Sequence, residues 1–283
     1  MKEKRLPSKS LGEKSFNIFN TILLIFLGLV AIYPIWFIFI GAFSDPAAYG
    51  NNPSFLLPRG FSFSAFATHL KNVEIWNAFG NTFFITIVGS AVSICLTILG
   101  AYVLARRDVP GVKILTIIVM LTIWLRPGMV AIYQNIDMLG LKGTMFGVIL
   151  PFALSAFNII LLRTGFMGIP RDVLEAAEID GANHFQILTK IMIPNALPSI
   201  TTISLFHVID RWNGYFWAEL VLDQERYPLQ VFIKESLTRQ SPDFYQTMAN
   251  AYSLILISVL PMLIIFPMIQ KVFKKGIMSG SIK

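Results

Sequence analysis

The chain has 283 residues, of which 55% are hydrophobic and only 14% are charged, and its formal net charge is +7. Soluble globular domains carry about 25% charged residues, so this composition leaves too little polar surface for a soluble fold. The same hydrophobicity excludes a disordered chain. A content of 19 glycines and one cysteine excludes the collagen-like and disulfide-rich classes. An integral membrane protein is the class that remains.

Six long apolar segments follow one another along the chain. A helix needs roughly 20 apolar residues to cross a bilayer, whereas the strands of a membrane barrel alternate over about 10 residues. We therefore predict an all-α integral membrane fold with six transmembrane helices. The first segment far exceeds the apolar core of a signal peptide, so we expect an uncleaved first helix. The segments are 18–43, 77–105, 114–135, 144–162, 191–222 and 250–270.

Basic residues collect on one side of this predicted topology. The N-terminal tail, the segments 106–113 and 163–190, and the C-terminal tail together hold 15 Lys and Arg, against 6 in the loops 44–76, 136–143 and 218–249. Lys and Arg are retained on the cytoplasmic side. We predict a multi-pass protein with both termini in the cytoplasm. The positive charge is then a signal of topology, and no nucleic-acid partner is expected.

The sequence lacks the common catalytic and cofactor motifs. It contains no G-x-x-x-x-G-K-[ST] phosphate loop and no H-E-x-x-H metal motif. It also contains no G-x-S-x-G nucleophile elbow. Cys95 lies in the middle of a predicted helix, where a packing role is expected. We predict neither an enzyme nor a metal or cofactor site in this chain. If the chain moves a solute, its energy comes from a gradient or from a partner.

The cytoplasmic segment 163–195 is predicted to hold two short helices that lie across the cytoplasmic face. Pro170 suits the first position of a helix. Gly181 suits the left-handed position just after a helix end. A second helix is expected over about 183–191, stopped by Pro194.

Four acidic residues distinguish this segment from the rest of the basic cytoplasmic side. One interpretation is an amphipathic connector resting on the bilayer. Anionic lipid attracts basic helices, however, so the acidic residues favour a protein partner. Ala176 and Ala177 keep the surface flat enough for close approach. The four residues are Asp172, Glu175, Glu178 and Asp180.

Several motifs resemble those of ABC importer permeases. Glu175-Ala176-Ala177, followed by Gly181 and then by Ile-Met-Ile-Pro at 191–194, resembles the EAA loop of that family, with Ile193 where the family has Leu. Further resemblances are Asn81-Thr82, the helix end at 100–106, Leu139-Gly140-Leu141 with Thr144, Trp212-Asn213 and Lys275-Gly276. They extend from about residue 76 to the C-terminus. They point to the carbohydrate branch, the family of the smaller maltose-permease subunit. Within that branch, the segment 45–63 looks closer to relatives that import complex oligosaccharides.

The resemblance implies a type I permease fold and a mechanism. The EAA loop is a coupling helix that docks on a cytoplasmic ATPase dimer. ATP and Mg²⁺ bind that ATPase, and the membrane cavity changes its access as the dimer closes. A second permease subunit forms a heterodimer with the chain in the bacterial cell membrane, and an extracytoplasmic solute-binding protein delivers the oligosaccharide. The implied docking residues are Glu175, Ala176, Ala177, Ile179, Asp180, Gly181 and Phe185.

The resemblance and the motifs together divide the chain into three parts. The first is an N-terminal part, 1–75, and the second is a permease domain, 76–270, with its coupling loop at 168–194. The third is a cytoplasmic tail, 271–283.

Ionisable residues inside predicted spans usually face a cavity or one another. Together with nearby aromatic residues they suggest a sugar-contacting lining. The alternative is structural: Asp210 pairs with Arg126, the aromatics form an interfacial belt, and the partner permease makes most sugar contacts. The candidate lining residues are Trp124, Arg126, His207, Asp210, Arg211, Trp212, Asn213 and Tyr215.

Three other functions stay open. A type I ABC permease for a non-sugar solute would share the docking loop. A secondary transporter or channel would work without an ATPase and has no use for that loop. A membrane-bound enzyme or an assembly scaffold would need chemistry or contacts for which the sequence offers no motif.

Overall fold

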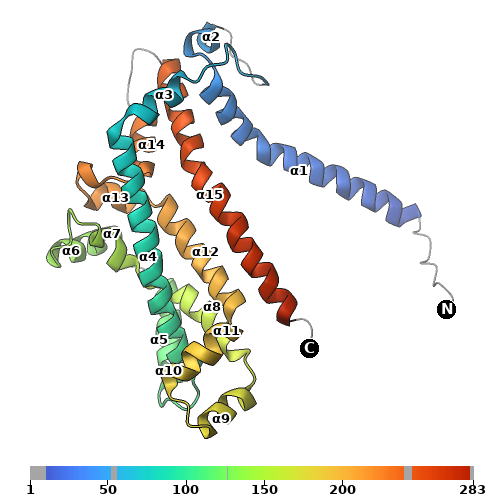
Figure 1. The fold of residues 1–283 in the computed structure, drawn as a ribbon, viewed down its shortest axis with the longest axis vertical. Coiled ribbons are helices and arrows are strands. Elements are labelled where there is room, and N and C mark those ends of the chain that lie inside the picture. The colour runs from blue at the N-terminus through green and yellow to red at the C-terminus, as the bar shows by residue number, and fades with distance from the viewer. Residues whose placement is uncertain (1–10, 52–55, 126, 239–243, 281–283) are drawn as a thin grey trace. The chain divides into compact units, whose positions relative to one another are not determined.

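The computed structural model describes residues 11–51, 56–125, 127–238 and 244–280, and no strand occurs among them (Figure 1). Three helices are long and apolar enough to cross a membrane alone: Gly12–Phe43, Val73–Ala105 and Phe244–Ile265. Three further pairs of helices pass the same test only as bent pairs, so the described residues hold three spans, or up to six. The predicted all-helical membrane class is confirmed.

The chain divides into two compact units, one comprising residues 1–69 and 236–257 and the other comprising 70–235 and 258–283. The first unit contains α1 (Leu11–Phe43), α2 (Pro46–Asn51), most of α3 (Ser64–Lys71) and the first part of α15 (Phe244–Gly280). In this unit Gly41 lies against the ring of Tyr252. The ring Nε2 of His69 is 2.8 Å from the backbone oxygen of Asn250.

The second unit is built around α4 (Val73–Ala105), which packs against α8 (Ala156–Met167) and α12 (Leu197–Asn213) (Figure 1). Small residues such as Ala78, Gly89 and Ala101 are buried on α4. Membrane helices approach closely where their contact faces carry small residues. This packing makes α4 the central helix of the unit.

Two of the bent pairs occupy segments for which the sequence predicts one helix each. The helices α5 (Val112–Trp124) and α6 (Met129–Met138) are bent by 112°. A bend of 51° separates α7 (Phe146–Ile149) and the 3₁₀ turn η1 (Leu150–Phe152) from α8. Pro127 and Gly128 lie at the first bend and Pro151 at the second, and proline removes a helical hydrogen bond.

The third bend, of 84°, separates α12 from a short composite helix. That helix comprises α10 (His184–Gln186), the π-helical turn η2 (Ile187–Met192) and α11 (Ile193–Asn195). The remaining elements are α9 (Arg171–Ile179), α13 (Phe216–Val221), the 3₁₀ turn η3 (Gln224–Arg226) and α14 (Leu229–Thr238).

Candidate functional site

The first candidate site is the docking segment, 168–195, which begins with α9. Pro170 precedes the first helical residue, and Asp172 lies in the first turn. At the other end Gly181 has a φ of +80°. Its N–H donates to the backbone oxygen of Glu178 at 3.1 Å, and the N–H of Ala182 donates to the backbone oxygen of Ala177 at 2.9 Å. This pair of bonds is a Schellman cap, so the predicted left-handed position of Gly181 is confirmed.

The second helix of the docking segment starts with a capping box. The side chain of Asn183 accepts from the Gln186 N–H, and the Gln186 side chain accepts from the Asn183 N–H, both at 2.9 Å. The prediction that Pro194 stops this helix is wrong, because α11 continues to Asn195. The preceding π-helical turn is the reason. The Ile193 N–H donates five residues back, to Leu188, and this widened turn accommodates the proline ring.

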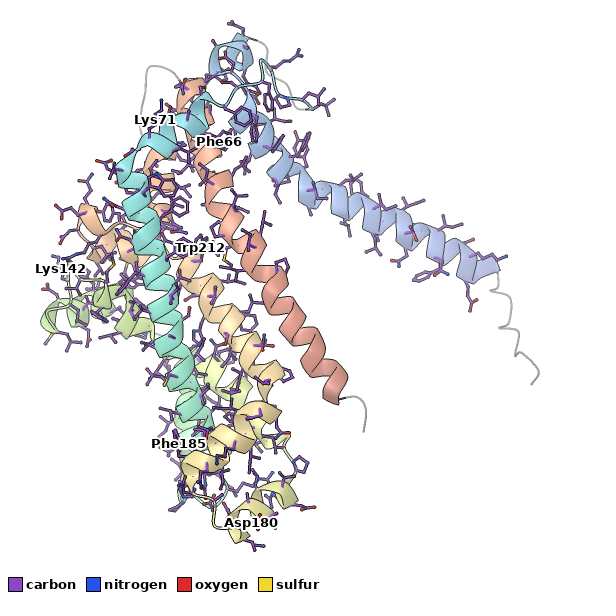
Figure 2. The ribbon with its side chains drawn as sticks, viewed as in Figure 1. Phe66, Lys71, Lys142, Asp180, Phe185 and Trp212 are labelled. Carbon is purple, nitrogen blue, oxygen red and sulfur yellow. The ribbon has the colours of Figure 1, made fainter. Side chains whose placement is uncertain are left out.

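Apolar and acidic side chains of the docking segment face outward together. Ile179 is 87% exposed and Phe185 is 73% exposed. Glu175, Ala176 and Asp180 are exposed as well. The opposite face packs through Leu174, Ala177 and Ala182 on the hydrophobic core. Figure 2 shows Asp180 and Phe185 at the same end of the ribbon. Large exposed apolar side chains rimmed by charge are typical of an interaction surface.

Arg106, at the C-terminal end of α4, holds both helices of the docking segment. Its Nε donates to both carboxylate oxygens of Asp108, at 2.9 and 3.1 Å. Its guanidinium lies 3.6 Å from the Glu178 carboxylate on α9 and contacts the ring of His184 on α10. The hydrogen bonds from Arg106 hold the pKa of Asp108 below its ordinary value. Sequence reasoning placed Arg106 in a helix-end motif but missed this role, which depends on contacts distant in sequence.

The second candidate site is a cavity of about 780 Å³ in the second unit. The end of α12 and the residues that follow it form one wall, with Asp210, Asn213 and Tyr215. The break before α8 forms another, with Phe152 and neighbouring residues. Phe152 and Trp217 pack with their ring centroids 5.1 Å apart. The cavity therefore combines aromatic faces with polar groups, as small-molecule sites do.

The predicted lining residues divide into two groups. Asp210, Arg211, Asn213 and Tyr215 line the cavity. The structure does not bring Trp124, His207 or Trp212 to it. Arg126 lies outside the described residues, so its lining role and its ion pair with Asp210 both stay predictions.

The three residues away from the cavity have other surroundings. Trp124 is 86% exposed. His207 is buried between α4 and α8, with its Nε2 3.3 Å from the Thr97 hydroxyl and 3.1 Å from the Asn158 amide. Trp212 is 3% exposed and packs edge-on against Phe83. His207 and Trp212 thus have the contacts of core residues.

Arg211 lines the cavity, yet its guanidinium is bound within the protein. Nη1 donates to the Val148 oxygen at 2.7 Å. Nη2 donates to the oxygens of Ile149 at 3.2 Å and Phe152 at 2.6 Å, and to the Ser93 hydroxyl at 3.2 Å. The side chain is 7% exposed. Three of these four hydrogen bonds therefore go to backbone oxygens at the break before α8.

Sequence reasoning missed the wall of the cavity at this break, including Phe152. Two local signals mark the break. Pro151 interrupts an apolar segment, and the Ser155 hydroxyl accepts from the Asn158 N–H at 3.3 Å to start α8. A serine before an apolar run is a sign of a helix start.

Comparison with known proteins shows the family. Residues 102–279 match the family model described as the binding-protein-dependent transport system inner membrane component. The chain belongs to this family. It is therefore a membrane-embedded component of a transport system that works with a separate binding protein, and it is not an enzyme.

Two curated relatives come from Bacillus subtilis (strain 168). Protein LplC is 32% identical over 282 residues, which cover 95% of each chain. The polygalacturonan/rhamnogalacturonan transport system permease protein YtcP is 33% identical over 92% of this chain and 95% of its own. A solved structure of a bacterial ABC transporter involved in the import of the acidic polysaccharide alginate contains a chain with 37% identity and a TM-score of 0.88. That similarity covers 95% of this chain and 100% of the other, so the chain has the type I permease fold.

Proposed function

We propose that the chain is the permease subunit of an ATP-driven importer of an oligosaccharide. The observation that carries the substrate class is the similarity over nearly the whole length to permease chains for alginate and for polygalacturonan or rhamnogalacturonan. The cavity is compatible with this class, because sugars bind to aromatic faces rimmed by hydrogen-bonding groups. A permease for a non-sugar solute is the alternative that the experiment below tests.

The docking segment is proposed to attach a separate ATPase dimer. Glu175 supplies a charged hydrogen bond to a basic group of the ATPase. Ala176 leaves room for close approach, and Ile179 and Phe185 supply exposed apolar contacts. Movement of the docked helices during ATP binding then switches the cavity between its two access states.

The proposed topology has six spans with both termini in the cytoplasm: the three long helices, the bent pairs α5–α6 and α7–α8, and α12. The helix α10–α11 stays with the docking segment in the cytoplasm. The distribution of basic residues supports this orientation. The permease domain is proposed to extend over 76–270, preceded by the part at 1–75 and followed by a cytoplasmic tail at 271–283. A second permease subunit completes the pathway through the membrane.

Within the cavity, Asp210, Asn213 and Tyr215 are proposed to hydrogen-bond sugar hydroxyls, and Trp217 and Phe152 to provide apolar faces. Arg211 shapes this lining from behind, because its guanidinium is bound to the backbone. The three polar residues come from the end of α12 and the turn after it. One short segment therefore presents most of the polar contacts.

The test is uptake by the complete importer in proteoliposomes. This chain is combined with a partner ATPase, a second permease and a solute-binding protein, and uptake of neutral and uronic-acid oligosaccharides is measured. ATP-dependent uptake of at least one oligosaccharide is expected, and Glu175→Lys should abolish it while the complex stays assembled. Uptake without the ATPase, or uptake of no oligosaccharide, would reject the proposal.

A further inference from the structure

Arg211 takes the place of helical hydrogen bonds at the break before α8. Backbone groups inside a membrane must be satisfied within the protein, because lipid offers no partner. The break between η1 and α8 interrupts the helical ladder there. Arg211 donates to the oxygens of Val148, Ile149 and Phe152, which belong to α7 and η1. The arginine therefore stabilises a bent backbone that forms a wall of the cavity.

The neighbouring helix α4 is shaped to receive this guanidinium. A Cβ added at Gly89 would lie 3.3 Å from both Cδ and Nε of Arg211. That distance is tighter than an ordinary contact, so a larger residue would displace the arginine. One turn further on, the Ser93 hydroxyl accepts from Nη2 at 3.2 Å. Three helical elements thus meet at one side chain: α4, α12 and the α7–η1 wall.

The helix that carries Arg211 begins one residue after the docking segment, at the 84° bend. Only Ala196 separates α11 from α12. Backbone hydrogen bonds run on both sides of it: the Ala196 N–H donates to Met192 at 2.9 Å, and its oxygen accepts from Ile200 at 3.0 Å. Ala196 is also buried. Arg211 lies fourteen residues after Leu197, about 21 Å along a helix, so α12 connects the hydrogen-bonded bend at Ala196 to the cavity wall.

We infer that Arg211 is a positioning residue that locks the cavity wall, Val148–Phe152, to α12, so that the wall follows the displacement of the docking segment. Rigid helices joined by hydrogen bonds can carry such coupling between distant sites. This inference rests on the proposed function for its role in transport. The lock itself is independent of any substrate.

The geometry distinguishes this role from simple charge compensation. Arginine presents a planar fork of donors, whereas lysine is a point charge with three donors. Four bonds to separate groups on α4 and on the wall require the fork. If the role were only to balance the charge of Asp210 next to it, lysine would serve equally well.

Thiol labelling in the complete importer, held in lipid nanodiscs, tests the lock. The background is Cys95→Ser, which removes this chain's only cysteine, with Ala153→Cys as the reporter at a site that is 3% exposed. Labelling is measured on this chain alone, separated from its partners. Arg211→Met is expected to raise the rate of reaction with N-ethylmaleimide about tenfold, since losing hydrogen bonds to a buried charge favours local opening. Arg211→Lys should give an intermediate rate and keeps the test valid if the methionine variant does not assemble.

Arg163→Met is the matched control. Arg163 donates from Nε to the Leu104 oxygen of α4 at 2.8 Å, away from the cavity, so its loss should leave the labelling rate unchanged. Equal rates in the background complex and in its Arg211→Lys and Arg211→Met variants would overturn the lock. Full restoration by Arg211→Lys would show charge compensation instead.

The transport role has a separate measurement, the number of sugar molecules imported per ATP hydrolysed. Arg211→Met is expected to lower this ratio about tenfold while ATP hydrolysis continues, and an unchanged ratio would reject the transport role. Labelling needs no sugar. If the unmodified importer moves no oligosaccharide, the proposed function fails while the labelling result still decides the lock.

Discussion

A side chain at position 181 is expected to disturb docking of the partner and to leave the fold intact. Gly181 has a φ of +80°, and a Cβ added there would have no described heavy atom of the chain within 4 Å. The cost of Gly181→Ala inside the chain is therefore the left-handed backbone alone, about 1 kcal/mol. Asn costs less because it tolerates this region. Domains are stable by roughly 5–15 kcal/mol, so both variants should stay folded.

The assay compares the amount of chain in the membrane with ATP-dependent uptake for Gly181→Ala, Gly181→Asn and Gly181→Asp. Amounts should match the unmodified chain, while uptake falls with Ala and Asn and is abolished by Asp, which adds a charge to a side chain of the same size as Asn. Weakening the free energy of docking by about 1.4 kcal/mol already lowers the affinity for the partner tenfold.

Gly111 provides the matched control for this series. It has a φ of +79°, and a Cβ added there would have no described heavy atom within 4 Å. It lies outside the docking segment, before α5. Gly111→Asp should therefore transport normally. Equal loss of uptake at both positions, or full uptake in all Gly181 variants, would refute the reasoning.

Three further outcomes follow from packing and protonation. Trp212→Ala should destabilise the chain by about 3–5 kcal/mol, since Trp212 is buried. Thermal aggregation of the solubilised protein should then show a large downward shift in its midpoint temperature. Unchanged stability together with altered sugar selectivity would contradict this prediction. Gly165→Ala should be destabilising by about 1–3 kcal/mol, because its Cβ would lie 2.8 Å from that of Ser199, and adding Ser199→Gly should restore part of the thermal midpoint. Burial lowers the pKa of His69, so its stability contribution is present above pH about 6.5 and declines as the pH falls below that value. Thermal unfolding measured from pH 8 to 5 should therefore show a smaller decline in the midpoint temperature for His69→Gln than for the unmodified chain.

The docking segment was predictable because its signals are local. Gly181 and Asn183 determine a helix end and the next helix start through bonds to residues at most five positions away. The prediction failed at Pro194, where the outcome depends on a π-helical turn. Such a turn is rare, so a proline normally indicates a helix end.

The cavity was less predictable because its geometry depends on distant contacts. Hydropathy treats 144–162 as one apolar segment, and Pro151 alone does not determine the direction in which the chain bends. Arg211 sets that geometry from about sixty residues away by binding the oxygens of Val148 and Phe152. No pattern within either segment specifies this pairing.

Asp210 and Arg211 show why an ionisable residue inside a span does not identify its own role. Both are charged neighbours in the last turn of α12, and sequence reasoning assigned both to the lining. Successive residues of a helix point about 100° apart, and here Asp210 is exposed beside the cavity while Arg211 is buried against Gly89 of α4. Charge in an apolar segment therefore marks a functional region. The position of each residue around the helix axis decides which of the two contacts the solute and which one holds the cavity wall.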